Sequence, residues 1–292
     1  MVTLTSNKTA LDTGSDKFGE LRESIDIAGD PSALRARIEE DGYLLIRGGL
    51  DRDQVMAARR EILQKLDRVG EIDREYPLMD AVCSGLSRRG EGDQDEFLKS
   101  LRTGDEVRKL VRQGRLNKFY QQFFGREIRP LDYIWVRTVP VGGFTGIHYD
   151  WVYMSRGSRR LHTTWIPVGD VPRDNGALLI LENSHRQEEL KQTYGQLDVD
   201  RDRDNNPYGG AVGGWYSEDA ATVRNELGGR WLTTDFRAGD MLVFGMWTLH
   251  CSLDNNSPEN RLRITVDARY QPADEPADER WVGADPVGHA AH

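Results

Sequence analysis

The sequence predicts an α+β fold in which helices cover one face or edge of a β-sandwich or jelly roll. Helical periodicity dominates before Pro130, and short segments rich in β-branched and aromatic residues follow it, separated by Gly, Pro, Asn and Asp. A run of helices followed by a run of strands is typical of this fold class. Nothing between the two halves resembles a linker, so we expect residues 19–270 of the 292-residue chain to form one domain.

The first part of that domain, residues 19–129, is expected to be mainly helical. Each helix has a capping residue at its start or a glycine after its end, and its apolar residues recur at helical spacing. The expected elements are, in order, a helix over residues 33–40 capped by Ser32, a buried strand over 43–46, a helix over 51–69 capped by Asp51, and a helical pattern over 93–124 that ends at Gly125.

The β core is expected over residues 130–270, with flanking segments that are less regular. A polar, lid-like insert over residues 186–235 interrupts the strands, and its Asp200–Asp204 run is expected to be a solvated turn. Residues 1–18 are expected to be a flexible arm and residues 271–292 an extended tail. The expected strands lie near residues 132–139, 145–149, 161–168, 177–182, 240–244 and 262–270.

Composition and charge exclude several classes of function. The formal net charge is -9, with 48 acidic and 39 basic residues interspersed, so we expect no nucleic-acid partner. The longest apolar runs are only a few residues, too short to span a membrane, and the N-terminus lacks a secretory pattern. Two cysteines, Cys83 and Cys251, form no disulfide framework, so a cytoplasmic location is expected. The sequence leaves the oligomeric state open.

Two histidines and an aspartate form the first candidate site. His148 and Asp150 follow a glycine-rich turn and are two residues apart, so on a strand they would point together into the sandwich interior. His250 ends an apolar strand about 100 residues later. Two histidines and one carboxylate are the ligand set of a non-haem Fe(II) site, which leaves coordination positions open.

Arginines close to His250 suggest a partner for such a metal. Arg261 follows His250 by eleven residues, and Arg263 would share its strand face. An arginine near an iron site can hold a carboxylate through two parallel hydrogen bonds. By itself, Arg263 is more typical of a surface or salt-bridge position.

The chain resembles the phytanoyl-CoA dioxygenase family of Fe(II)- and 2-oxoglutarate-dependent oxygenases. The resemblance rests on His148-x-Asp150, on His250 with Arg261 eleven places on, and on the flanking segments. These segments are Trp165-Ile-Pro-Val-Gly-Asp170, Asp174-Asn175-Gly176 to His185, Gly239-Asp240 and His250-Cys251-Ser252, with a looser match over residues 42–48. Two departures are Glu182-Asn183, where the family has Pro-Gly, and Cys251, where it has Gly. Neither departure removes a candidate ligand.

The resemblance implies a double-stranded β-helix (cupin-like) core, with Fe(II), 2-oxoglutarate and O2 as cofactor and cosubstrates. It implies that His148, Asp150 and His250 bind the iron, and that Arg261 holds the distal carboxylate of 2-oxoglutarate with help from Ser252. The carboxylate of Asp150 favours hydroxylation over halogenation. Other positions expected to line the cosubstrate pocket are Trp165, His185 and Arg137, the last facing either cosubstrate or substrate.

The substrate is expected to be a small polar metabolite, oxidised in a natural-product or sugar tailoring step. Four aromatic residues are candidates for its pocket, because they follow the His-x-Asp motif or lie in the insert: Trp151, Tyr153, Trp215 and Tyr216. Three alternatives remain open, namely an acyl-CoA or lipid-like substrate, a non-catalytic jelly-roll binding protein, and a cupin-type metalloenzyme that needs no 2-oxoglutarate.

Overall fold

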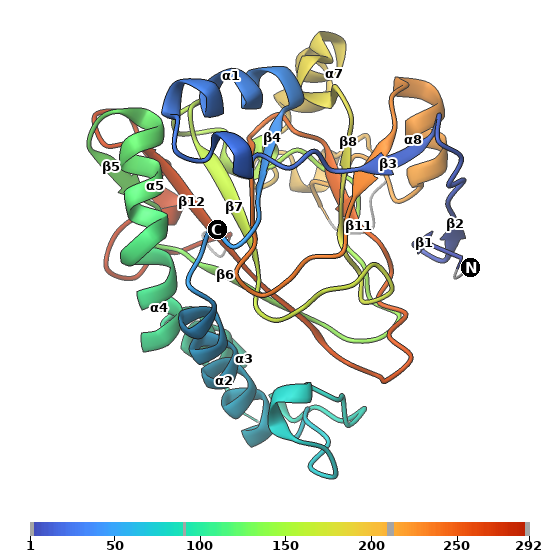
Figure 1. Ribbon diagram of the computed structural model, residues 1–292, viewed down its shortest axis with the longest axis vertical. Helices are drawn as coiled ribbons and strands as arrows, with labels where there is room; N and C mark the ends of the chain where they lie inside the picture. Colours follow the sequence, from blue (N-terminus) through green and yellow to red (C-terminus); the bar gives the residue numbers. More distant parts are fainter. Residues whose placement is uncertain (1–2, 90–91, 209–212, 290–292) are drawn as a thin grey trace.

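Two facing antiparallel-rich sheets form the centre of the molecule (Figure 1), so the predicted α+β jelly roll is confirmed. The computed structural model describes residues 3–89, 92–208 and 213–289. The larger sheet has the order β4-β10-β7-β12-β5, and β6 also pairs with β12. Its strands are β4 (Tyr43–Ile46), β5 (Ile128–Pro130), β6 (Trp135–Val139), β7 (His162–Pro167), β10 (Met241–Gly245) and β12 (Arg263–Pro272). The smaller sheet has the order β11-β8-β9-β3, with β3 (Phe18–Glu20), β8 (Leu178–Leu181), β9 (Trp231–Thr233) and β11 (His250–Ser252).

The two faces of the larger sheet differ because side chains alternate along each strand. In β10, Leu242 and Phe244 face the smaller sheet, whereas Met241 and Val243 face the helices. In β12, Ile264 and its alternate neighbours enter the helix-side core. The residues between them, Arg263, Thr265, Asp267 and Arg269, are buried polar groups on the inner face. The sheet therefore has an apolar outer face and a partly polar interior.

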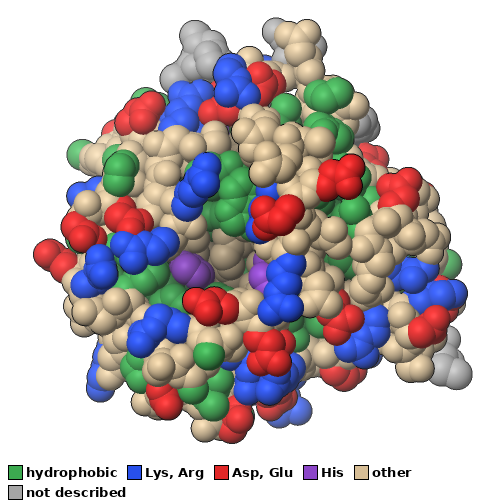
Figure 2. All heavy atoms as spheres, turned by 90° about the horizontal axis from the view of Figure 1, so that it is seen from above, with side chains coloured by type: hydrophobic (Ala, Val, Ile, Leu, Met, Phe, Trp, Pro, Cys, Tyr) green, Lys and Arg blue, Asp and Glu red, His purple; other side chains and the backbone are tan. Residues whose placement is uncertain are grey.

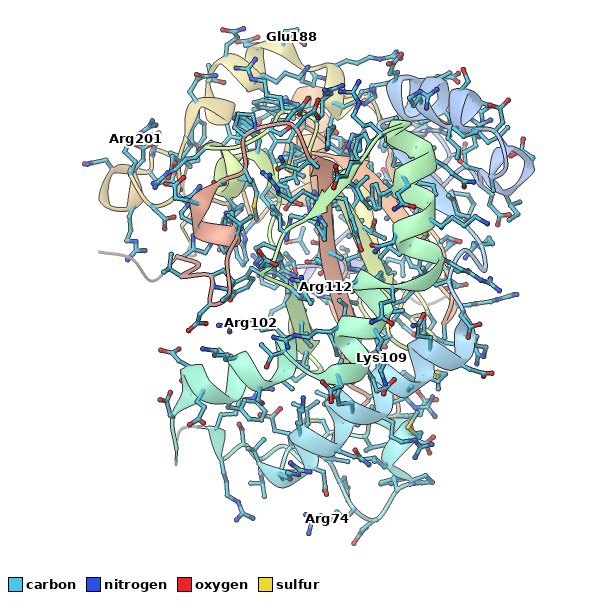
Figure 3. All side chains as sticks on the ribbon, turned by 90° about the vertical axis from the view of Figure 1, so that its left-hand side faces the viewer. Arg74, Arg102, Lys109, Arg112, Glu188 and Arg201 are labelled. Atoms are coloured by element: carbon cyan, nitrogen blue, oxygen red, sulfur yellow. The ribbon has the colours of Figure 1, made fainter. Side chains whose placement is uncertain are left out.

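Helices cover the outer face of the larger sheet (Figure 1). They are α1 (Pro31–Asp41), α2 (Arg52–Arg68), α3 (Gln94–Arg102), α4 (Asp105–Arg112) and α5 (Gly114–Phe124). Helix α1 begins before the predicted Ser32 cap, because the Asp30 carboxylate accepts hydrogen bonds from the backbone N–H groups of Ser32 and Ala33. The long helical pattern over 93–124 forms three helices, divided near Gly104 and Gly114. Arg102, Lys109 and Arg112 lie on α3 and α4 in Figure 3.

The expectation of a flexible arm is wrong for residues 3–18, the part of that segment that the structure describes. Strands β1 (Thr5–Ser6) and β2 (Thr9–Ala10) form a hairpin against the segment that carries β11. The Ser6 hydroxyl donates to the backbone oxygen of Ser252, and Leu11 is buried in the core. Buried hydrogen bonds and an apolar anchor fix this segment, although its sequence lacks periodicity.

Two further expectations are wrong for the described residues. The C-terminal segment from residue 271 is not an extended tail, and the Asp200–Asp204 run of the insert is not simply a solvated turn. The 3₁₀ helix η7 (Glu279–Trp281) places Trp281 fully within the core. The buried Arg280 guanidinium donates to carboxylates of the insert, Asp198 and Asp200, and to Asp278. Arg201, in the same run, projects from the molecule in Figure 3. Ion pairs between segments far apart in sequence therefore fold both of them against the β core.

Short elements complete the described chain. Within the insert, the N-terminal part packs into the core through buried Leu190 and Tyr194, and helix α8 follows later in the chain. These elements are η1 (Ile25–Ile27), η2 (Leu78–Asp80), α6 (Trp151–Met154), η4 (Ser184–Arg186), α7 (Glu188–Gln192), η5 (Tyr194–Gln196), η6 (Arg203–Asn205) and α8 (Ala220–Leu227).

The surface agrees with the interspersed charge of the sequence. The face seen in Figure 2 mixes acidic and basic side chains rather than gathering one sign. Within the described residues, no helix is both long and apolar enough to cross a membrane.

Candidate active site

Two histidines lie side by side because their backbones pair directly. The backbone N–H of His148 donates to the His250 oxygen at 3.0 Å, and the reverse bond is 3.1 Å. This antiparallel pair places the two imidazole ring centroids 4.2 Å apart. After His148 the chain leaves the expected strand and turns into α6, with Asp150 as the residue before the helix. All three side chains are buried at the same end of the sandwich.

The three side chains direct unshared electron pairs to one point. The Nδ1 atoms of His148 and His250 lie 2.8 and 2.9 Å from the backbone oxygens of Gly146 and Thr248. A carbonyl only accepts, so each Nδ1 carries the proton and each Nε2 is left as a ligand atom. The Asp150 Oδ1 atom lies 3.6 Å from His148 Nε2 and 3.9 Å from His250 Nε2. Three acceptors this close need a cation between them, which fits a metal ion.

Electrostatics keep this ligand set ready for a cation. Burial, followed by the neighbouring His148, lowers the pKa of His250 to about 3, so His250 is neutral near pH 7. Burial alone would raise the pKa of Asp150, but the Arg269 guanidinium holds it well below its usual range. Asp150 is therefore ionised.

The second oxygen of Asp150 is occupied by two donors. Arg269 Nη2 donates to Oδ2 at 2.9 Å, and the Thr163 hydroxyl also donates to Oδ2. Oδ1 is thus the oxygen left to face the histidines. Sequence reasoning missed Arg269 and Thr163, although the polar alternation of β12 from Arg263 to Arg269 was a readable signal.

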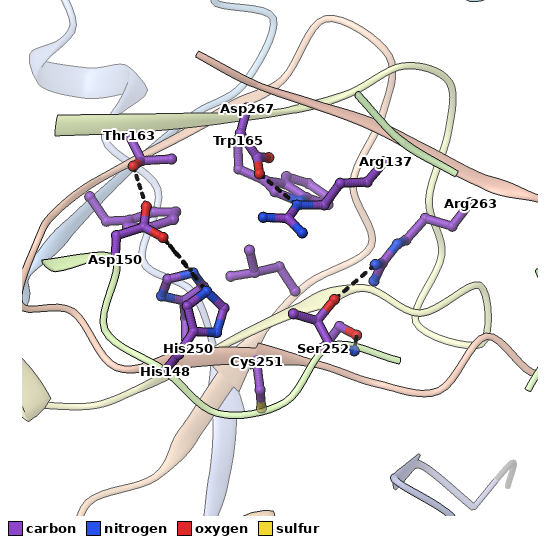
Figure 4. A pocket seen from close by; sticks show the side chains of 13 residues that line it. Arg137, His148, Asp150, Thr163, Trp165, His250, Cys251, Ser252, Arg263 and Asp267 are labelled. Carbon is purple, nitrogen blue, oxygen red and sulfur yellow. Dashed lines mark hydrogen bonds and ion pairs between the residues drawn. The ribbon is translucent and has the colours of Figure 1, made fainter. Parts of the chain in front are cut away.

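A narrow inner pocket extends from the three ligands between the sheets (Figure 4). Arg263 lies at its far end, where its guanidinium donates to the Gly176 oxygen and lies 3.4 Å from Thr145 Oγ1. Arg263 Nε is a buried donor with no hydrogen-bond partner among the described residues. Ser252 and Trp165 line the same pocket, as expected from the sequence. A buried arginine with an unused donor, facing three metal-type ligands, fits a dicarboxylate such as 2-oxoglutarate.

The structure places Arg261 outside this pocket, so it does not support Arg261 as the carboxylate-binding residue. Strand β12 begins at Arg263, and residues 261 and 262 instead bond with residues 81 and 82 of another segment. The strand alternation that would keep Arg261 and Arg263 on one face therefore does not reach Arg261, whose side chain is exposed.

His185 also lies outside the pocket. Asn183 adopts a left-handed conformation, and the 3₁₀ turn η4 directs His185 toward α1. There its Nε2 lies 3.1 Å from the Glu39 oxygen, and its ring packs against Gly42. The interaction with α1 replaces the expected contact with cosubstrate.

An outer cavity of about 500 Å³ adjoins the inner pocket. Tyr153 and Trp215 line it, whereas Trp151 and Tyr216 do not. Trp151 is two residues before Tyr153 on a helical turn, so it points to the opposite side and packs on Trp247. Tyr216 alternates with Trp215 along an extended segment and packs on Tyr194 and Tyr208.

Residues distant in sequence complete the outer cavity. Tyr133 and Trp135 come from the β core, and His289 comes from the tail. Arg137 lines both cavities, together with Thr145, His148 and Asp150. Its Nε donates to Asp267 at 2.8 Å. The cavities therefore meet at the candidate metal ligands.

The comparisons with known proteins agree with this geometry. The family model described as phytanoyl-CoA dioxygenase matches residues 38–263. The chain belongs to the phytanoyl-CoA dioxygenase family. The 1-deoxypentalenic acid 11-beta-hydroxylases of Streptomyces exfoliatus and Streptomyces arenae are 22% and 24% identical to it. Each alignment covers 89% of this chain and 87% of the relative.

Solved structures of the same family share the fold. The epimerase SnoN, in complex with Fe3+, alpha ketoglutarate and nogalamycin RO, has a TM-score of 0.57 and 22% identity, covering 88% of this chain and 94% of SnoN. The carbocyclase SnoK from nogalamycin biosynthesis has a TM-score of 0.57 and 19% identity, covering 90% of each chain. As a member of the phytanoyl-CoA dioxygenase family, the protein is an Fe(II)- and 2-oxoglutarate-dependent oxygenase that uses O2.

Proposed function

We propose that the protein hydroxylates, or otherwise oxidises, an unactivated C–H bond of a small polar metabolite in a natural-product or sugar tailoring step. The observation that carries the proposal is the convergence of three buried ligand atoms beside a pocket that ends at a buried arginine. The hydroxylase relatives act on a small molecule, 1-deoxypentalenic acid, which supports a substrate of comparable kind. A cytoplasmic location remains a prediction.

In this proposal, Nε2 of His148, Nε2 of His250 and Oδ1 of Asp150 hold Fe(II). Arg263 binds the distal carboxylate of 2-oxoglutarate, and Ser252, Thr145 and Trp165 shape the pocket around it. Bound Fe(II), 2-oxoglutarate and O2 together supply the oxidant for the C–H bond, with release of succinate and CO2. The protein's contribution is to fix the ligand atoms, to bury the site and to place the substrate beside it.

An acyl-CoA or lipid-like substrate is the second candidate. Such a substrate would require unpaired basic residues at the cavity mouth to bind the CoA phosphates. Of the three arginines that line the outer cavity, Arg89 and Arg269 are paired with Glu71 and Asp150. The third, Arg137, lies beside the candidate metal ligands, and one free guanidinium edge does not match the several phosphates of CoA. The small polar metabolite is therefore the preferred class.

The test compares Arg263→Gln with Arg261→Gln, two arginines that are two residues apart. The anaerobic Fe(II) protein is titrated with 2-oxoglutarate while the visible charge-transfer band is recorded. Loss of a charge-assisted hydrogen-bond pair predicts that Arg263→Gln raises the dissociation constant by about 10- to 100-fold. Arg261→Gln should change it by less than about 3-fold, because its side chain lies outside the pocket.

A larger rise of the dissociation constant in Arg261→Gln than in Arg263→Gln would contradict the assignment of Arg263. It would show that Arg261 binds the distal carboxylate of 2-oxoglutarate. A wild-type protein that binds Fe(II) but gives no band with 2-oxoglutarate would overturn the cosubstrate pocket itself. Circular dichroism of both variants checks that each is folded.

A further inference from the structure

The outer cavity has a wall of aromatic rings beside the candidate metal ligands. Five rings from four parts of the fold line it: Tyr133, Trp135, Phe144, Tyr153 and Trp215. Aromatic faces and edges bind the apolar body of a ring-shaped ligand without fixing its polar groups. The wall therefore offers a packing surface for the carbon ring of a cyclic metabolite, and the ring's orientation depends on a polar group of the cavity.

The arginines on this wall differ in how their nitrogens are used. Arg89 donates to Glu71 and to the Thr138 hydroxyl. Arg269 donates to Asp150, and its guanidinium carbon lies 3.9 Å from the Trp135 ring centroid. Arg269 Nε and Nη1 have no hydrogen-bond partner among the described residues, but the whole side chain is buried against Trp135 and Asp150.

Arg137 differs from both because its two terminal nitrogens are free and its side chain is partly exposed. Its Nε donates to Asp267, which fixes the plane of the guanidinium. Among the described residues, Nη1 and Nη2 have no hydrogen-bond partner, and in Figure 4 they point into the pocket. The side chain keeps 36% of its exposure although it lies between the sheets, so this exposed surface faces the cavities.

The position of Arg137 relates it to the reaction centre. It lines both cavities together with His148 and Asp150, so a group bound to its free edge lies beside the candidate metal ligands. Asp150 is the one carboxylate among the described residues that line the outer cavity, and its Oδ2 is already bonded to Thr163 and Arg269. An incoming anion therefore meets a free guanidinium edge, while the carboxylate of Asp150 is bonded through Oδ2 and directs Oδ1 at the histidines.

We propose that the substrate is a cyclic carboxylic acid whose carboxylate binds Nη1 and Nη2 of Arg137 while its ring body packs against the aromatic wall. The free edge of a guanidinium matches the two oxygens of a carboxylate. This inference rests on the proposed function, since it assigns the substrate class of the same site. In this proposal two arginines bind different carboxylates. Arg137 binds the carboxylate of the substrate, and Arg263 binds the distal carboxylate of 2-oxoglutarate.

The experiment uses adamantane-1-carboxylate and its neutral isostere adamantane-1-carboxamide as probes. Quenching of tryptophan fluorescence reports binding, since Trp135 and Trp215 line the cavity, and this readout does not need iron. A second titration adds each probe to the anaerobic protein with Fe(II) and saturating 2-oxoglutarate. Wild-type protein should bind the acid about 10-fold or more tighter than the amide.

Arg137→Gln should remove this preference, and Arg137→Lys should retain part of it. Arg89→Gln is the matched control, because that arginine lines the same cavity with its Nη2 already bonded to Glu71 and Thr138, and the preference should persist. The dissociation constant for 2-oxoglutarate should change by less than about 3-fold in Arg137→Gln.

Three results would overturn the proposal. They are equal binding of acid and amide by the wild-type protein, no binding of the acid, or a preference that survives Arg137→Gln while 2-oxoglutarate binding collapses. The last result would assign Arg137 to the cosubstrate. Failure of the proposed function is distinguishable, because it would abolish the charge-transfer band with 2-oxoglutarate and leave the fluorescence comparison intact.

Discussion

Asp150 illustrates how single residues set the chemistry of the site. Its Oδ2 is held by Arg269 and Thr163, which leaves Oδ1 directed at the histidines. A carboxylate fixed in this way is prepared to bind a metal through one oxygen. The role of Arg269 is therefore one of positioning, since it acts on the metal site through Asp150.

We predict that Arg269→Met weakens Fe(II) binding by about 10- to 100-fold, because supporting partners of metal ligands have effects of this size. Arg269→Lys should recover part of the affinity, since an ammonium can still donate to Oδ2. Anaerobic titration with Fe(II) measures both variants. Unchanged affinity in a folded Arg269→Met protein would show that Thr163 suffices to orient Asp150.

Gly146 allows the wall of the outer cavity to approach the His148 segment. A Cβ atom at Gly146 would lie 2.3 Å from the Trp215 ring, which is closer than any real contact. We predict that Gly146→Ala displaces Trp215, shifts the fluorescence spectrum and destabilises the protein by about 1–3 kcal/mol. Gly213→Ala is the control, since a Cβ there meets nothing within 4 Å. Identical spectra for the two variants would disprove the contact.

At the scale of elements, strand β12 connects the core under the helices with the cavities between the two sheets. Its outward residues pack under the helices, while its inward residues supply Arg263, Asp267 and Arg269 to the cavities. The tail continues from β12 and is fastened to the insert by Arg280, which brings His289 to the outer cavity. The insert and the tail thus form one edge of the cavity together.

We predict that Arg280→Met destabilises the protein by roughly 3 kcal/mol near pH 7, because the buried carboxylates of Asp198, Asp200 and Asp278 lose the buried cation that they share. The melting temperature should fall by about 10 °C. Arg74→Met, which removes a solvent-exposed pair with Asp67, should leave the melting temperature almost unchanged.

The loss caused by Arg280→Met should depend on pH. Burial would raise the pKa values of Asp198 and Asp200, but hydrogen bonds from arginines hold them below the usual 3.8. Their ionised forms therefore stabilise the folded state above about pH 3.8, and this contribution is lost as the pH falls below that value. Melting curves of wild type and variant should converge in acid; a constant difference would contradict the ion-pair explanation.

At the scale of the whole molecule, the proposed ligand set would couple metal binding to stability. His148 and Asp150 come from one segment and His250 from a strand about 100 residues later, so a bound cation links distant parts of the β core. A ligand that binds only the folded state stabilises it by mass action.

We predict that anaerobic Fe(II) at about 100 times its dissociation constant stabilises the fold by about 2.7 kcal/mol and raises the melting temperature by roughly 5–10 °C. His148→Ala should abolish this rise. His185→Ala should retain it, since His185 lies against α1 rather than in the pocket. A metal-dependent rise that persists in His148→Ala would place the ion elsewhere.

The sequence by itself determined the fold class, the candidate ligand set and the cofactors. These inferences depend on local information: apolar periodicity, a two-residue spacing, a histidine at a strand end and short flanking motifs. Strand pairing then had only to bring two short segments together, and the backbone bonds between His148 and His250 do so. Trp165 lies in the pocket on a predicted strand, whereas Ser252 lies there because it follows His250 on β11, a strand that the sequence analysis did not predict.

Only the tertiary structure decided which arginine faces the cosubstrate pocket and what encloses the substrate cavity. The choice between Arg263 and Arg261 depends on where β12 begins, and pairing of residues 261–262 with residues 81–82 sets that boundary. Arg280, Trp281 and His289 gain their roles through contacts with segments 80 or more residues away. Such long-range contacts leave no periodic trace in the sequence, since each depends on the packing of the completed fold.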